Sequence, residues 1–216
     1  MMQRLVTRKM EIKKLGEQLT PEFEKELISS RVLLDRLVVI DEASRKSVAY
    51  QDPRYAPFYF HLGKFVQPKT LVEFGFGLGL LSSCFFAKCE TVESFLAYEP
   101  STDDFYSPRL AFSNVKKFYH GGKLDFYRGK ATDDDFLRKL GENEWDLAFL
   151  NDETSLDQNR DYLDLLWERM SLDGLIVVNY LSRNEPTKDA FETFCKIVNR
   201  KPVFFATRYG TGIVQK

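Results

Sequence analysis

From residue 70 onward the chain alternates between two hydrophobic patterns. Short apolar runs, typical of buried strands, are each followed by a longer segment in which apolar positions recur every three or four residues, typical of helices. The strand-like runs are TLVEF (70–74), SFLAYEP (94–100), GKLDFYRG (122–129), WDLAFLN (145–151) and DGLIVVNY (173–180). Strands that alternate with helices predict a parallel sheet covered by helices on both faces.

The two ends of the chain depart from this alternation. Residues 201–216 hold two β-rich stretches around a turn, which predicts a hairpin with an antiparallel last strand. Residues 1–60 show helical spacing after a Thr20-Pro21 cap, but the segment 49–65 is aromatic, contains two prolines and is predicted to be irregular. We therefore expect an N-terminal helical cap over 1–60 and one three-layer, doubly wound α/β domain of seven strands over 61–216.

Composition excludes several classes of protein. The 216 residues include 31 basic and 32 acidic side chains, so the excess of positive charge typical of nucleic-acid binders is missing. No apolar run approaches the roughly 20 residues that span a bilayer, and we expect a soluble, cytoplasmic protein without a membrane or nucleic-acid partner. Cys84, Cys89 and Cys195 lack the spacing of a disulfide framework or a zinc knuckle. The aromatic-rich start is compatible with a homodimer.

The first strand runs into a turn with three glycines, VEFGFGLG (72–79). Glycines between a strand and a helix let a nucleotide-like ligand approach the backbone beside the helix N-terminus. Glu99, at the end of the next strand, is placed to accept hydrogen bonds from ribose hydroxyls. A dinucleotide motif needs G-x-G-x-x-G, but Leu80 occupies the third glycine position, which counts against an NAD-dependent oxidoreductase.

The glycine turn resembles the first motif, hhExGxGxG, of the class I S-adenosylmethionine (SAM) methyltransferases. Further segments are similar to that family's later motifs, in the same order: LAYEP (96–100), YRGKA (127–131), WDLAFLND (145–152) and SLDGLIVVNY (171–180). The closing RYGTGIVQK (208–216) is similar to the β-hairpin that ends the O-methyltransferase branch. The resemblance covers about residues 60–216 and implies the strand order 3-2-1-4-5-7-6, with SAM as cofactor and S-adenosylhomocysteine as product.

The same resemblance implies a set of cofactor-binding residues. The glycine turn (Gly75, Phe76, Gly77 and Gly79) would face the methionine part of SAM, and Glu73 would lie near its amino group. Glu99, at the end of the second strand, would hold the ribose. Ala131 would lie beside the adenine, and Asn151 would lie beside the methionine end. Glu73 is alternatively a buried carboxylate that only fixes the turn.

The chain departs from the O-methyltransferase branch at its metal site. That branch places an Asp after the fourth strand and Asp-Asn after the fifth to hold a divalent metal, whereas this chain has Asn151 and Asn179-Tyr180. Thr154 stands where that branch has a catalytic lysine. Mg²⁺ prefers charged oxygen ligands, so we expect no metal site.

Asp152 is the candidate general base, and a backbone hydrogen bond at a loop or helix start is an equal alternative for it. The candidates for the substrate side are Tyr50, Tyr55, Phe58, Glu153, Asn179 and Tyr180. For several of them, packing in the core is an equal explanation. Because the SAM sulfonium is already activated, positioning of the acceptor supplies much of the rate without a metal.

The sequence therefore predicts a metal-independent SAM-dependent methyltransferase that acts on a small molecule or a protein side chain. The main alternative is a non-catalytic SAM-binding or interaction protein, because the metal ligands and the lysine are replaced. An NAD-dependent oxidoreductase is the less favoured alternative.

Overall fold

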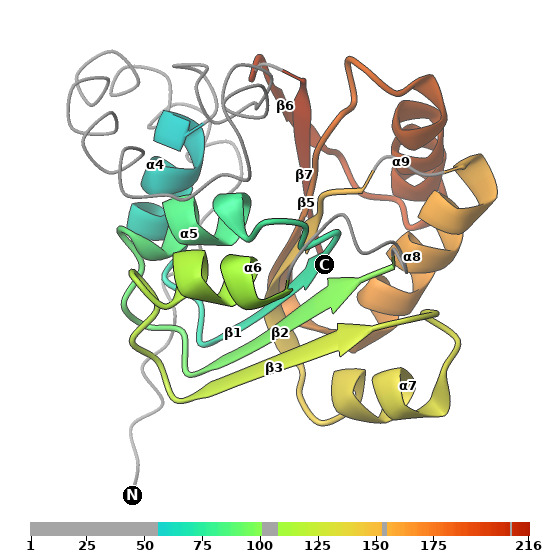
Figure 1. Ribbon diagram of the computed structural model, residues 1–216. Helices are drawn as coiled ribbons and strands as arrows, with labels where there is room; N and C mark the ends of the chain where they lie inside the picture. Colours follow the sequence, from blue (N-terminus) through green and yellow to red (C-terminus); the bar gives the residue numbers. More distant parts are fainter. Residues whose placement is uncertain (1–55, 101–107, 153–154, 208) are drawn as a thin grey trace, which may run out of the picture.

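The computed structural model describes residues 56–100, 108–152, 155–207 and 209–216. Its strands form one seven-stranded sheet with the order β3-β2-β1-β4-β5-β7-β6, which crosses the middle of Figure 1. The strands are β1 (Thr70–Phe74), β2 (Ser94–Glu99), β3 (Lys123–Arg128), β4 (Trp145–Leu150), β5 (Met170–Val178), β6 (Val203–Phe205) and β7 (Thr211–Gln215). The predicted strand order is confirmed.

Strand direction brings the ends of several strands to one edge of the sheet. β1 to β5 pair in parallel, with Phe74 opposite both Tyr98 and Leu150. β7 is antiparallel to β5 and to β6, as the predicted hairpin requires, and Val178 lies opposite Gly212. The carboxyl ends of β1, β2, β4 and β5 and the start of β7 therefore meet at the same edge.

Helices cover both faces of the sheet, as Figure 1 shows. The helices on one face are α4 (Ala56–Val66), α5 (Leu80–Phe86) and α6 (Pro108–Val115), and those on the other are α7 (Asp134–Leu140), α8 (Leu156–Arg169) and α9 (Glu185–Ile197). Successive strand residues point to opposite faces, so Leu71 joins one apolar core and Val72 the other. Because both faces are buried, the strands appear as continuous apolar runs.

Helix α4 corrects one expectation, because its residues belong to the segment predicted to be irregular. Pro57 is the second residue of the helix, where a missing backbone N–H breaks no helical hydrogen bond. A Cβ atom at Gly63 would lie 2.3 Å from the carbonyl oxygen of Phe85, so the glycine allows α4 to pack closely against α5. The predicted domain boundary at 60/61 falls inside α4, and residues 1–55 of the predicted cap lie outside the described residues.

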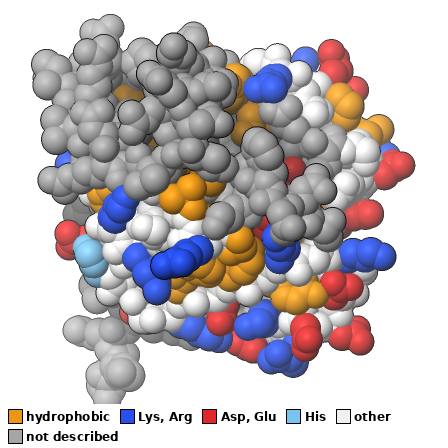
Figure 2. Space-filling model, viewed as in Figure 1, with side chains coloured by type: hydrophobic (Ala, Val, Ile, Leu, Met, Phe, Trp, Pro, Cys, Tyr) orange, Lys and Arg blue, Asp and Glu red, His pale blue; other side chains and the backbone are white. Residues whose placement is uncertain are grey.

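The described surface is mixed in charge. Around α7, at the lower right of Figure 2, acidic and basic side chains are interspersed, and Arg138 pairs with Asp135 and Glu142 at 3.6 and 3.1 Å. Within the described residues, no helix is long and apolar enough to cross a membrane. The three cysteines are free and buried.

Candidate functional site

The glycine turn joins β1 to α5 at the carboxyl edge of the sheet. Gly75, Gly77 and Gly79 have φ angles of 82°, 51° and 65°, a region that favours glycine. A Cβ atom at Gly75 would lie 2.4 Å from the backbone oxygen of Asn151, and one at Gly79 would lie 2.8 Å from Cγ2 of Val115. A Cβ atom at Gly77 would meet none of the described residues within 4 Å. Packing therefore requires glycine at positions 75 and 79, whereas Gly77 borders space that the described part of the chain leaves open.

The turn is fastened to the end of β2. The backbone N–H groups of Gly75 and Phe76 both donate to the carbonyl of Tyr98, at 3.0 and 3.2 Å. The backbone N–H of Gly77 donates to Oε2 of Glu99 at 2.6 Å, and Glu99 is 7% exposed. The structure thus brings Glu99, the last residue of β2, against the glycine turn and next to Gly77.

Glu73 lies inside the sheet one residue before the end of β1, and it is fully buried. The hydroxyl of Ser82, on α5, donates to its Oε2, while its Oε1 has no hydrogen-bond partner among the described residues. Burial raises the pKa of Glu73 to about 8; the Ser82 hydrogen bond partly offsets this, and the negative charge of Glu99 adds to it. The carboxyl group is therefore mostly protonated at pH 7 unless a cation lies beside it.

A chain of neutral side chains connects the hairpin to the glycine turn. Thr211 donates to Oδ1 of Asn179 at 2.8 Å, Nδ2 of Asn179 donates to Oδ1 of Asn151 at 2.9 Å, and Nδ2 of Asn151 donates to the Gly75 carbonyl at 3.2 Å. Because Thr211 has a single hydroxyl hydrogen, Thr207 must be the donor in the 2.8 Å bond between the two threonines. Every member of the chain therefore donates toward Gly75.

This donor direction gives a physical reason for amides at both positions. Replacing Asn151 by aspartate would put a carboxylate oxygen against the Gly75 carbonyl, and replacing Asn179 by aspartate would put one against Oδ1 of Asn151, so each change would place two acceptors face to face. Among the residues that the structure describes, no group of three or more His, Cys, Asp or Glu side chains could hold a metal ion.

The remaining cofactor candidates lie close to this edge. Asn151 is half-buried and follows β4, and Ala131 is half-buried in the turn after β3. The ring of Phe76 points into the core, with its centroid 5.9 Å from those of Phe95 and Phe126, so only its backbone belongs to the turn.

The structure separates the substrate-side candidates. Phe58 is fully buried against Tyr59 and Phe205, with ring centroids 5.1 and 5.0 Å away, so it packs in the core and presents no surface to a ligand. Tyr180 is half-buried, with a φ of 66°, and stacks on Tyr209 at 5.3 Å.

Asn179 is buried within the polar chain, and Asp152 is half-buried directly after Asn151. Tyr50, Tyr55 and Glu153, like Thr154, lie outside the described residues.

Sequence reasoning missed three supporting residues. Ser82 donates a hydrogen bond to Glu73, and Thr211 donates one to Asn179. Nδ2 of Asn114, on α6, donates to the Leu78 carbonyl at 3.1 Å and so holds the glycine turn against that helix. Ser82 and Asn114 sit in ordinary helical patterns, so only their three-dimensional neighbours reveal these contacts.

Comparison with known proteins places the fold. No family model matches the sequence, and neither does any curated protein. Solved structures do match. An O-methyltransferase from Bacillus cereus in complex with SAH is 14% identical, with a TM-score of 0.61 over 90% of this chain and 100% of that one.

Two further structures match over most of the chain. A putative caffeoyl-CoA O-methyltransferase from Staphylococcus aureus is 14% identical, with a TM-score of 0.59 over 96% of this chain and 98% of that one. The O-methyltransferase TomG from Streptomyces achromogenes, in complex with SAM, is 15% identical, with a TM-score of 0.58 over 90% of this chain and 98% of that one. The chain therefore has the O-methyltransferase-like fold of the class I SAM-dependent methyltransferases.

Proposed function

We propose that the protein is a SAM-dependent methyltransferase that works without a metal. The observation that carries this proposal is the glycine turn at Gly77, where Glu99 accepts the backbone N–H and no other described residue approaches the position of a Cβ atom. Oε1 of the buried Glu73, which no described residue hydrogen-bonds, lies behind the turn and supports the proposal. The similar structures from Bacillus cereus and Streptomyces achromogenes, which contain SAH and SAM, give independent support.

The residues at this edge fit the chemical groups of SAM. The carboxylate of Glu99 would accept hydrogen bonds from the ribose hydroxyls, and Gly77 leaves room for the cofactor beside it. Glu73 would hold the amino group, directly or through water, and Ala131 and Asn151 would lie at the adenine and methionine ends. When bound, SAM supplies a methyl group already activated on a sulfonium sulfur.

Positioning is the main task left to the protein. The polar chain from Thr211 to Gly75 keeps the turn and the ends of β4 and β5 in one arrangement, so that an acceptor can lie in line with the methyl group. Asp152, next to Asn151, is the candidate that takes the proton from the acceptor's nucleophilic atom. The neutral amides supply no charge to bind Mg²⁺, and we propose a small molecule or a protein side chain as the acceptor.

Calorimetric titration with S-adenosylhomocysteine (SAH) tests the proposal. We expect binding in the micromolar range that is the same with Mg²⁺ and with a chelator, and no binding of NADH. Binding that needs Mg²⁺ would overturn metal independence. Binding of NADH in place of SAH would assign the glycine turn to a dinucleotide.

The second candidate function is a SAM-binding protein without catalysis. It is favoured by one observation: Asn151 and Asn179 are hydrogen-bonded to each other at the edge where O-methyltransferases hold their metal. A screen of small molecules and proteins for transfer of a labelled methyl group from SAM separates the two. Turnover above that of heat-treated protein supports the enzyme, and SAH binding with no labelled product from any acceptor supports the second candidate.

A further inference from the structure

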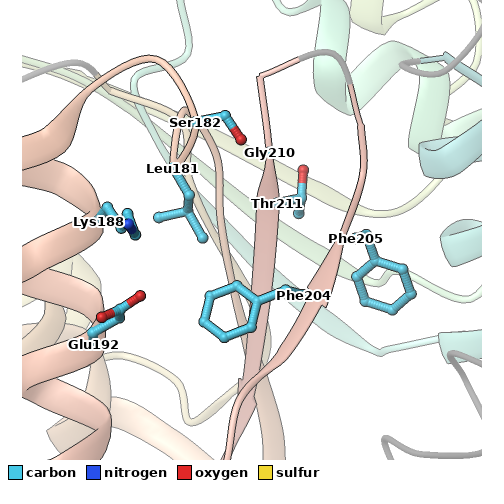
Figure 3. A pocket seen from close by; sticks show the side chains of 8 residues that line it. All are labelled: Leu181, Ser182, Lys188, Glu192, Phe204, Phe205, Gly210 and Thr211. Carbon is cyan, nitrogen blue, oxygen red and sulfur yellow. The ribbon is translucent and has the colours of Figure 1, made fainter.

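A second concave site lies away from the glycine turn, between α9 and the β6–β7 hairpin. It has a volume of about 230 Å³, and its lining residues are Leu181, Ser182, Lys188, Glu192, Phe204, Phe205, Gly210 and Thr211. In Figure 3, Lys188 and Glu192 extend from α9 toward this space, Leu181 points into it from the segment after β5, and the ring of Phe204 stands across from the helix. The pocket is thus built from three separate elements.

Close backbone packing joins two of the segments that line the pocket. Gly210 has a φ of 72°, and a Cβ atom there would lie 2.2 Å from Oγ of Ser182. Ser182 and the end of the hairpin loop are also tied together, because the Ser182 N–H donates to the Tyr209 carbonyl at 2.7 Å. Phe205 contacts Phe58 of α4, on the opposite face of the sheet. The hairpin is therefore fixed on both sides, and α9 with Phe204 forms the mouth.

The lining combines opposite charges with an apolar wall. Lys188 and Glu192 are one helical turn apart on α9, close enough for a pair on the helix surface, yet in the described structure they form no ion pair with each other or with another side chain. Leu181 is buried, and Phe204 is 53% exposed, which leaves an aromatic face open beside the two charges. Both charges and the ring are available to the same small ligand.

We propose that this pocket is a second ligand site, which takes a small zwitterion with an apolar body, such as a free apolar α-amino acid. The ligand's carboxylate would meet Lys188, its ammonium group would meet Glu192, and its side chain would pack on Phe204 and Leu181. A simple anion would lie against Glu192, and a simple cation against Lys188, so neither satisfies both charges. Pockets for drug-sized molecules measure about 300–1,000 Å³, so a smaller ligand fits this volume.

Titration with L-phenylalanine, in the absence of SAM and SAH, tests the site. We expect saturable binding by calorimetry in the millimolar range or tighter. The two matched analogues are 3-phenylpropionate, which lacks the ammonium group, and 2-phenylethylamine, which lacks the carboxylate. Each should bind at least about tenfold more weakly, since each loses one charge-assisted hydrogen bond. No binding of phenylalanine, or equal binding of either analogue, would overturn the proposal.

Variants on α9 locate the binding site. Lys188→Met and Glu192→Gln should each weaken phenylalanine binding by at least about tenfold. The matched controls, Lys196→Met and Glu185→Gln, change exposed residues of the same helix that do not line the pocket, and they should bind as the unchanged protein does. Equal weakening by the controls, or none by Lys188→Met, would place the binding elsewhere.

One more variant separates this site from the proposed cofactor site. Phe204→Ala removes the exposed aromatic wall of the pocket, so it should weaken phenylalanine binding by at least about tenfold while SAH affinity stays unchanged. If phenylalanine still binds with full affinity, the pocket assignment is wrong. A protein that binds phenylalanine but not SAH would refute the proposed function and leave the second site standing.

Discussion

Ionisation of Glu73 should make the stability of the protein fall as pH rises from mildly acidic to neutral. The side chain is fully buried, and its pKa is raised from 4.5 to about 8. In the unfolded chain the carboxyl loses its proton near pH 4.5, while in the folded chain it keeps it until about pH 8. Between these values the folded state binds more protons, so the free energy of unfolding decreases with pH.

The size of this effect follows from the pKa values. Each pH unit between them changes the free energy of unfolding by about 1.4 kcal/mol, so Glu73 lowers stability by at most about 3 kcal/mol between pH 4.5 and pH 7. Glu73→Gln keeps an oxygen that can accept the Ser82 hydrogen bond and removes the ionisation. The unfolding free energy of the variant, minus that of the unchanged protein, should therefore increase steadily from pH 5 to pH 7.

Urea denaturation at a series of pH values measures this difference. Glu90→Gln, which changes an exposed carboxylate, is the matched control, and its curve should run parallel to that of the unchanged protein. If Glu73→Gln also gave a parallel curve, Glu73 would ionise as an exposed carboxyl does, and the reasoning from its burial would be refuted.

The same proton gives a signature for cofactor binding. An ammonium group placed beside Glu73 would favour the ionised carboxylate, so SAH binding at pH 7 should release close to one proton. Calorimetry in two buffers with different heats of ionisation measures this number. Glu73→Gln should release none, and equal release by both proteins would remove Glu73 from the amino-group site.

Three further predictions follow from the packing at the same edge. Thr211→Val removes the hydroxyl group that donates to Asn179, so it should destabilise the protein by about 1–3 kcal/mol in urea denaturation and weaken SAH binding. Thr211→Ser retains the hydroxyl and should retain both the stability and the SAH affinity. Equal effects of the two changes would contradict a role for the hydroxyl. Gly79→Ala should lower the unfolding free energy more than Gly77→Ala, because among the described residues only the Cβ atom at position 79 meets neighbours. Gly77→Ala should weaken SAH binding with a stability loss of about 1 kcal/mol. The reverse order of stability loss would contradict this difference in packing. Cys84, whose pKa burial raises to about 12, should react with a thiol reagent at pH 8 only after unfolding, and rapid labelling of the native protein would show that the helix α5 face is open.

The fold could be predicted from the sequence because local patterns and packing agree. The strands are buried on both faces, so each appears as an apolar run, and the helices between them keep their periodicity. Helix α4 escaped the prediction because Pro57 and the aromatic residues after it look like an interruption. A proline in the first turn is compatible with a helix, and burial against α5 and the sheet stabilises it.

The site could be predicted only in part. Glu99 and the glycines are recognisable because they stand at or just after the carboxyl ends of strands, and the structure brings them together. Contacts between distant segments leave no such pattern. The bond from Thr211 to Asn179 joins residues 32 positions apart, and the protonation of Glu73 depends on complete burial. The spacing of residues in the sequence therefore predicts which edge of the sheet holds the site. The hydrogen bonds and protonation states of its residues can be read only from the folded structure.

The affinity for SAH with and without Glu99 tests the central claim most directly. Glu99→Ala removes the carboxylate next to Gly77, and Glu93→Ala, which removes an exposed carboxylate paired with Lys69, is the control. Loss of two hydrogen bonds to a charged acceptor, at about 1.5–3 kcal/mol each, predicts binding weakened by at least about a hundredfold in Glu99→Ala. The control should bind SAH as the unchanged protein does. Equal SAH affinity in all three proteins would show that this edge of the sheet does not hold the cofactor's ribose.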